Sequence, residues 1–378
     1  MSAIHPEIDP EGLLEYSVVF TDRSLNHMSQ QFQGVMNDLS EGLKEVYNAH
    51  AVAVIPGGGT YAMEAVARQF ATGRRALILR NGWFSFRWSQ ILDMGQITDT
   101  VHVLKAQQNA DLPNAPFAPP VLDEVLAEIA EFQPEVVFAP HVETSSGMLL
   151  PDDYVRSVAA AVHAVGGIMV LDCIASGALW VDMADTGVDV LISAPQKGWS
   201  ASPCAGLVML SELGLERARS ATSTSFACDL GKWLDIMAAY EGGGHAYHAT
   251  MPTDGLTKFR DTLLETREFG FDKARESQLE LGRRVRNLVG QFGFASVAAE
   301  GFEAPGVVVS YTDNADIRSG SKFAAEGMQV AAGVPLQCDE PEGFSTFRIG
   351  LFGLDKLKNI ERTVDKLQDA LQQVTTSS

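Results

Sequence analysis

Short apolar segments alternate with amphipathic segments over the first two thirds of the chain. Between Ser29 and Tyr47 the apolar positions recur every three or four residues, which predicts an amphipathic helix. Helical patterns also cover Pro120–Phe132 and Asp152–Val165. Apolar runs of strand length lie before, between and after them: Ala51–Ile55, Ala76–Leu79, Val101–Leu104, Glu135–Pro140, Ile168–Asp172, Val188–Ser193 and Gly206–Leu210. This alternation predicts an α/β fold with a mostly parallel sheet covered on both faces.

The alternation weakens after Ser211, where a glycine-rich segment precedes a charged helical region from about Leu256 to Phe292. The remainder predicts strand, helix, strand and helix, in this order: Val307–Tyr311, Ser321–Gly327, Thr346–Phe352 and Leu354–Val374. We therefore expect three parts: an irregular arm over residues 1–28, a large α/β domain over 29–265 and a small α+β domain over 266–378.

Composition excludes several classes of function. The 378 residues carry a formal net charge of −20 and no block of lysine or arginine, which argues against nucleic acid as a partner. No apolar run approaches the ~18–20 residues that cross a bilayer, and the acidic N-terminal segment lacks the order of a signal peptide. We therefore exclude membrane-spanning and secreted proteins and expect a cytoplasmic one.

The four cysteines are far apart and form no CxxC pair, which fits neither a zinc site nor a disulfide framework. No histidine or acidic residue stands at metal-ligand spacing from Asp172, and HEXXH is absent from the segment that begins at His141. We expect no metal.

Glycines mark the first candidate site, Gly57-Gly58-Gly59-Thr60, between a buried strand and a helix. Glycines let the backbone approach a ligand closely, and a helix start offers free N–H groups to a phosphate. The segment matches neither GxxxxGK[ST] nor GxGxxG, so an ordinary tight turn is the alternative.

Polar residues follow three other predicted strands. Lys197 comes after Val188–Ser193 and is either a Schiff-base lysine or a solvated loop residue. Asp172 ends its strand, where a carboxylate caps a helix, binds a metal or pairs with a cation. The loop His141–Gly147, with sequence HVETSSG, offers hydrogen bonds to a polar ligand or is an ordinary loop. The carboxyl ends of parallel strands are where α/β folds bind ligands.

Taken together, these motifs meet the needs of pyridoxal 5′-phosphate. Its phosphate needs N–H donors, its ring nitrogen a carboxylate and its aldehyde a lysine amine. On HVETSSG, LDCIAS and SAPQK the chain resembles the class V aminotransferases of fold type I, over roughly residues 30–370. Within that family it is most similar to the alanine/serine–glyoxylate aminotransferase group.

The resemblance implies a fold and a set of roles. The fold would be a large domain on a sheet of the seven-stranded type with a small C-terminal α+β domain. Lys197 would bind the cofactor covalently and Asp172 would pair with its ring nitrogen. Phe84, rather than Trp83, would stack on the ring, or these aromatics fill a helix–sheet interface. The other cofactor-binding residues would be Gly58, Gly59, Thr60, Thr144 and Gln196.

The resemblance also implies a homodimer with shared active sites, because Tyr247 and Thr250 would reach the cofactor phosphate of the neighbouring subunit. Arg348 would bind the substrate α-carboxylate, a task that suits the guanidinium fork. The family's Gly-Pro-Gly-Pro-like segment is replaced by a different one that contains Arg23 and His27. These two residues would contact a distinctive substrate group, or the arm packs at the dimer interface.

The implied activity is transamination between a small alanine-like or serine-like donor and a 2-oxo acid such as glyoxylate or pyruvate. Other class V activities remain as alternatives: a phosphoserine, aminophosphonate or aminosulfonate transaminase, or a cysteine desulfurase or lyase that uses Cys338. A non-catalytic pyridoxal phosphate-binding protein would tend to lose Lys197, Asp172 or Arg348, and all three are present.

Overall fold

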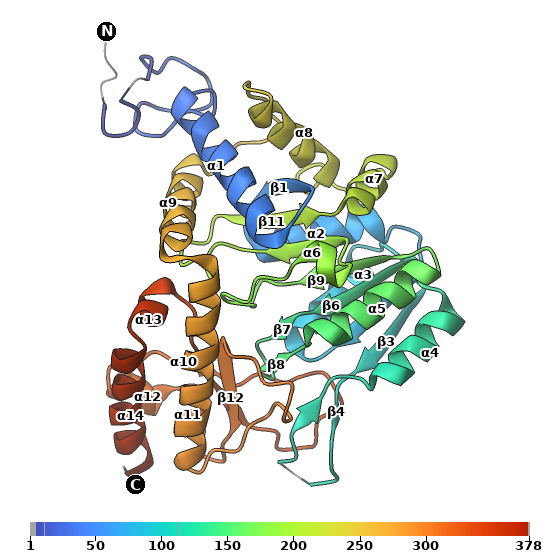
Figure 1. Cartoon of the computed structure of the whole chain (residues 1–378), viewed down its shortest axis with the longest axis vertical. Helices are drawn as coiled ribbons and strands as arrows, with labels where there is room; N and C mark the ends of the chain where they lie inside the picture. Colours follow the sequence, from blue (N-terminus) through green and yellow to red (C-terminus); the bar gives the residue numbers. More distant parts are fainter. Residues whose placement is uncertain (1–4, 11, 113, 377–378) are drawn as a thin grey trace.

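The computed structural model describes residues 5–10, 12–112 and 114–376. The arm and helix α1 (Gln30–Tyr47) lie at one end of the molecule, and the C-terminal helix α14 (Ile360–Thr376) lies at the other (Figure 1). Within the described ranges, no helix is both long and apolar enough to cross a membrane. Residues 1–4 and 11 of the predicted arm lie outside them.

A seven-stranded sheet forms the centre of the fold. Its order is β1-β11-β10-β9-β6-β2-β3. Strand β11 runs antiparallel to both of its neighbours, and the other pairs are parallel, which confirms the mostly parallel sheet. The strand bounds are β1 Ala51–Pro56, β2 Ala76–Arg80, β3 Val101–Lys105, β6 Val136–Pro140, β9 Ile168–Asp172, β10 Val190–Ser193 and β11 Ala205–Leu210.

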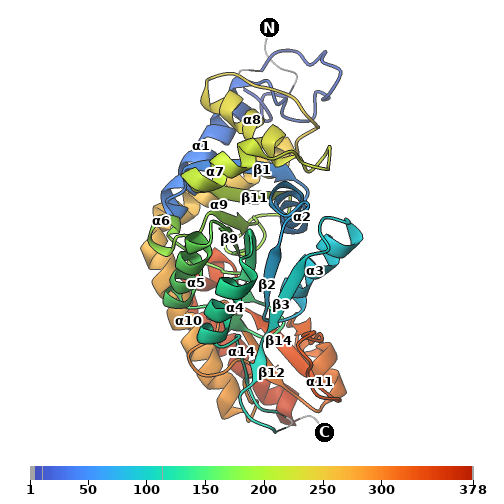
Figure 2. The same cartoon turned by 90° about the vertical axis from the view of Figure 1, so that its right-hand side faces the viewer.

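Helices cover both faces of this sheet (Figure 2). Helices α2 and α3 lie on one face and α4 and α5 on the other, with bounds Gly59–Phe70, Trp83–Met94, Leu122–Phe132 and Asp152–Ala164. Helix α1 begins where the Ser29 side chain accepts the N–H of Phe32 at 3.0 Å, and it ends at Asn48 in the left-handed conformation. The predicted first helix is thus confirmed to within one residue.

Some helices differ from the sequence pattern. Helix α3 was not predicted, nor were α7 (Glu212–Ser220) and α8 (Leu230–Glu241). The charged region predicted after residue 256 is two helices, α9 (Thr253–Phe269) and α10 (Phe271–Gln291). They are separated at Gly270, whose φ of 99° continues neither helix. The last predicted helix is likewise two, α13 Leu354–Lys358 and α14.

The C-terminal part carries a sheet of its own, in the order β12-β14-β13, and all of its pairs are antiparallel. The bounds are β12 Val307–Tyr311, β13 Ala331–Ala332 and β14 Thr346–Gly350. The hydrophobic cluster around the central sheet extends as far as Leu263, whereas Ala274 and Phe347 belong to a second cluster. The second cluster also includes Ala178, and a third cluster joins Val142 to Val309, so the clusters do not divide the chain at a single residue.

Candidate active site

A cavity of about 230 Å³ lies at the carboxyl ends of β9 and β10. Asp172 is the last residue of β9, and Lys197 follows shortly after the end of β10. Because these strands are parallel neighbours, their ends share one edge of the sheet. The cavity collects most of the predicted site residues: Gly59, Thr60, Phe84, Thr144, Asp172, Gln196 and Lys197.

The glycine segment turns the chain sharply from β1 into α2. Gly57 has a φ of 122°, a conformation that side chains disfavour. A Cβ on Gly59 would lie 2.5 Å from Cδ1 of Ile174, so any larger residue here would require the Ile174 side chain to move. Gly58 caps α2 without a side-chain hydrogen bond, which leaves the first N–H groups of this helix available to an anion.

Burial shapes the electrostatics of the cavity. It raises the pKa of Asp172 to about 7, although this carboxylate accepts the N–H of Ile174 at 2.9 Å. Burial, followed by the positive charges of Arg348 and Arg87, lowers the pKa of Lys197. Desolvation opposes the charged form of each residue and therefore shifts the two pKa values toward each other.

Phe84 enters the cavity from the first turn of α3, and Trp83 is not among the lining residues. The start of α3 is held by Glu143, a fully buried carboxylate of the HVETSSG segment. It accepts the N–H of Phe84 at 3.2 Å and that of Ser85 at 2.8 Å. Sequence reasoning missed this role, because residues 143 and 85 are far apart in the chain.

Arg348 approaches the cavity from β14 in the C-terminal part. Its guanidinium carbon lies 5.7 Å from the centroid of the Phe84 ring, and its Nε donates to the carbonyl of Ala332 at 2.9 Å. Burial lowers the pKa of this arginine. Arg348 is not among the residues that line the cavity, and it lies next to the cavity on the side of Phe84.

Arg87 is a lining residue to which sequence reasoning gave no role. It lies one turn after Phe84 on α3, and its guanidinium carbon is 4.7 Å from the centroid of that ring. NH1 of Arg87 donates to Oγ1 of Thr60 at 3.2 Å. The only sequence signal was its spacing of three residues from Phe84, which places both on one helix face.

Tyr247 and Thr250 are not among the residues that line this cavity. They lie in the segment between α8 and α9, where their side-chain oxygens are 3.1 Å apart. The Tyr247 ring packs 5.6 Å from that of His27, and 54% of the tyrosine is exposed. These two predicted residues therefore do not contribute to the cavity of their own chain.

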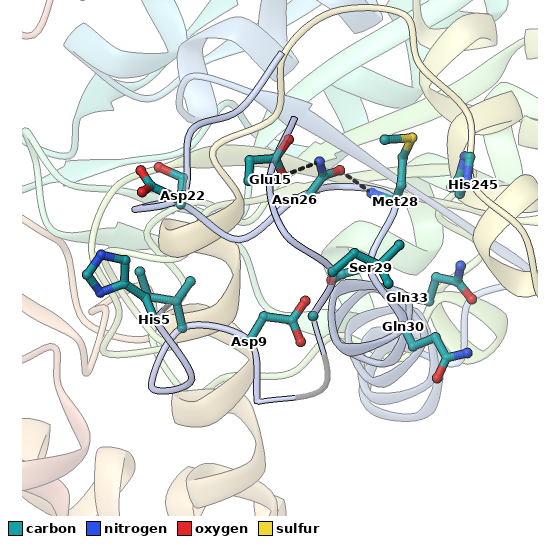
Figure 3. A pocket seen from close by; sticks show the side chains of 14 residues that line it. His5, Asp9, Glu15, Asp22, Asn26, Met28, Ser29, Gln30, Gln33 and His245 are labelled. Atoms are coloured by element: carbon teal, nitrogen blue, oxygen red, sulfur yellow. Dashed lines mark hydrogen bonds between the residues drawn. The ribbon is translucent and has the colours of Figure 1, made fainter. Parts of the chain in front are cut away.

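A larger cavity of about 490 Å³ lies between the arm and the start of α1 (Figure 3). Glu15, Asp22 and Asn26 contribute to its walls, and Asn26 donates to Glu15 at 2.7 Å. No predicted catalytic or cofactor-binding residue lines it, and neither do Arg23 and His27. The smaller cavity at the sheet edge therefore holds the candidate chemistry.

The model of one protein family, described as aminotransferase class V, matches residues 13–341. The chain belongs to the class V aminotransferase family. As a member of this family it is an aminotransferase.

Individual class V relatives agree with this assignment. The chain is 27% identical to the alanine–glyoxylate aminotransferase of Oryctolagus cuniculus, over 93% of this chain and 88% of the relative. It is 25% identical to the 2-aminoethylphosphonate–pyruvate transaminase of Vibrio parahaemolyticus, over 86% and 84%. The crystal structure of the Nostoc sp. alanine–glyoxylate aminotransferase shares the fold, with a TM-score of 0.77, 20% identity and coverage of 92% and 88%.

Cys338 is the residue on which a desulfurase alternative depends, and its environment opposes that chemistry in this aminotransferase. The thiol is 4% exposed and donates to the carbonyl of Arg80 at 3.3 Å. Burial raises its pKa to about 12. A sulfur-accepting cysteine needs an accessible thiolate, and this thiol is neither accessible nor ionised at neutral pH.

Proposed function

We propose that this class V aminotransferase transfers an amino group between a small amino acid, such as alanine or serine, and a 2-oxo acid, such as glyoxylate or pyruvate, with pyridoxal 5′-phosphate as cofactor. The observation that carries the proposal is the cavity in which Lys197, Asp172 and the start of α2 come together. The alanine–glyoxylate relatives support the choice of substrates.

The residues of the cavity fit the phosphate of this cofactor. A Cβ on Gly58 would meet no atom within 4 Å, so open space adjoins the start of α2. In the described part of the chain, the buried Oε1 of Gln196 has no hydrogen-bond partner. Because Gln196 also lines the cavity, a flip of its amide would make Nε2 available to a phosphate oxygen.

When bound, pyridoxal phosphate supplies an aldehyde that links reversibly to amines and a ring that withdraws electrons from the substrate. Nζ of Lys197 is the amine that holds it. The lowered pKa of Lys197 increases the fraction of neutral amine that takes the proton from the substrate α-carbon and returns it. Asp172 holds a proton at the ring nitrogen, and Arg348 holds the α-carboxylate.

We also propose that the enzyme is a homodimer in which each subunit completes the other's site. Tyr247 and Thr250, which do not line the cavity of their own chain, would bind the cofactor phosphate of the partner subunit. The arm supports this arrangement, because Leu13, Tyr16 and Val18 are 90%, 89% and 101% exposed. Apolar side chains exposed to this extent on one segment indicate a surface that is covered by a partner.

We propose a separate role for each of the three parts of the chain. The arm over residues 1–28 would contact the partner subunit, the domain over 29–265 would hold the cofactor, and the domain over 266–378 would bring Arg348 to the substrate. We place the enzyme in the cytoplasm, because all four cysteines are buried and unpaired, as in a reducing compartment.

A screen of amino donors tests the proposed function. Purified enzyme loaded with pyridoxal phosphate is mixed with L-alanine, L-serine, 2-aminoethylphosphonate or L-cysteine, and the visible absorbance of the bound cofactor is followed. We expect alanine or serine to remove the band fastest and to yield the matching oxo acid. Faster reaction with the phosphonate, or release of sulfide from cysteine, would replace our substrate assignment.

A further inference from the structure

Arg87 is a cationic residue of the cavity that the proposed mechanism leaves without a task. Among the residues that line the cavity, it and Lys197 are the two with a formal positive charge. Lys197 is committed to the cofactor aldehyde. A phosphate ester carries nearly two negative charges at neutral pH, and no other lining side chain offers a full charge to balance it.

Arg87 differs from the neighbouring Arg68 in its ion pairing. Arg68 lies in the groove beside the cavity, to which Arg87 also contributes, and it is bound to Glu64 at 2.8 Å. Among the ion pairs of the described residues, none includes Arg87. An arginine beside a cavity and without an ion pair is available to an anionic ligand.

The contacts of Arg87 place that ligand at one end of the cavity. NH1 donates to Oγ1 of Thr60, in the first turn of α2, 3.2 Å away. This is the end at which helix N–H groups point into the open space beside Gly58. The Phe84 ring, 4.7 Å from the guanidinium, holds the planar group in place by a cation–π contact.

We infer that Arg87 is the counter-cation of the cofactor phosphate. Together with Thr60 it binds the phosphate oxygens. Its cation–π contact with Phe84 connects the phosphate-binding residues to the aromatic residue proposed to stack on the cofactor ring. The inference rests on the proposed cofactor. It assigns Arg87 to the cofactor rather than to an anionic group on the substrate, because Thr60 belongs to the helix start and not to the strand that carries Arg348.

The test compares two cofactors that differ in the phosphate alone. Dissociation constants of pyridoxal phosphate and of pyridoxal are measured by visible absorbance for the wild-type protein, Arg87→Gln, Arg87→Lys and the control Arg68→Gln. We expect Arg87→Gln to weaken pyridoxal phosphate binding about ten- to hundredfold and pyridoxal binding less than twofold. Arg87→Lys should recover part of the loss, and Arg68→Gln should behave as wild type.

Several results would overturn the inference. An equal loss of affinity for both cofactors in Arg87→Gln would mean that the arginine supports either the binding of the cofactor ring or the fold. The thermal midpoint of unfolding of the apo-protein distinguishes these two roles, because only a loss of fold stability lowers it. Unchanged cofactor affinities with a raised KM for the amino donor would assign Arg87 to a substrate anion. Failure of the wild-type protein to bind either cofactor would contradict the proposed function itself, and it is recognised without any variant.

Discussion

The buried carboxylate of Glu143 accepts the backbone N–H of Ser85 at 2.8 Å, and this bond ties the loop after β6 to the start of α3. The same carboxylate accepts the Ser85 hydroxyl at 2.8 Å and the N–H of Phe84 at 3.2 Å. Helix α3 carries Phe84 and Arg87 into the cavity. Glu143 is therefore a positioning residue, which acts on the site through the helix that it caps.

Removal of this cap should cost both stability and cofactor affinity. Glu143→Ala leaves several buried donors without an acceptor, so we expect the free energy of unfolding to fall by about 3 kcal/mol. Glu143→Gln retains one acceptor oxygen and should lose less. Urea unfolding and cofactor titration measure the two effects, with the exposed Glu131→Ala on α4 as control. Equal stability of Glu143→Ala and Glu131→Ala would contradict this role.

Features that depend on one continuous segment of the chain were predictable from the sequence, and contacts between distant segments were not. The strands and the places of Asp172 and Lys197 at strand ends were predictable, because buried strands are continuous apolar runs and strand ends share an edge. The cap on α3 and the contact between Arg87 and Thr60 were not, because each joins segments far apart in the chain. The break between α9 and α10 depends on the conformation of one residue, Gly270, which an amphipathic pattern does not reveal.

Two adjacent glycines should respond differently to the same substitution. Gly59→Ala places a methyl group 2.5 Å from the end of the Ile174 side chain, which must move, so we expect the apo-protein to lose about 1 kcal/mol of stability. The Cβ of Gly58→Ala meets open space and its backbone is extended, so apo stability should change little. That methyl group should instead obstruct the phosphate and weaken pyridoxal phosphate binding. Equal behaviour of the two variants in unfolding and in cofactor binding would contradict the proposed phosphate site at the start of α2.

The raised pKa of Asp172 predicts a specific pH dependence of the apo-protein. Between its ordinary value of 3.8 and about 7, the folded protein keeps a proton that the unfolded chain has released. The free energy of unfolding must therefore fall as pH rises through this window. Asp172→Asn removes this contribution, which amounts to at most roughly 4 kcal/mol.

Urea unfolding of the apo-proteins from pH 4.5 to pH 8 measures this difference. Relative to wild type, Asp172→Asn should gain stability as pH rises to 7 and then show a constant difference. The asparagine keeps an oxygen that accepts the N–H of Ile174, and a change in the strength of this hydrogen bond adds an offset that does not vary with pH, so it does not imitate this result. Parallel curves for the two proteins would show that the Asp172 carboxyl titrates normally.

Shared active sites predict that two inactive variants restore each other. Lys197→Ala lacks the amine, and the double variant Tyr247→Phe, Thr250→Val lacks the hydroxyls proposed to reach the partner subunit. In a mixed dimer one site carries both defects and the other carries neither. We expect co-refolded mixtures to regain up to about a quarter of wild-type activity, as random pairing of shared-site dimers requires. No gain over the separate variants would mean that each subunit's site is complete by itself.

A single turnover of the loaded enzyme tests the central claim most directly. The wild-type protein, reconstituted with pyridoxal phosphate and freed of excess cofactor, is mixed with L-alanine in the absence of any oxo acid. The account expects loss of the visible band together with one pyruvate per subunit, and return of the band with formation of glycine when glyoxylate is added. Lys197→Ala should show neither change. Turnover by Lys197→Ala at the wild-type rate, or a wild-type band that persists with every amino donor, would contradict the account.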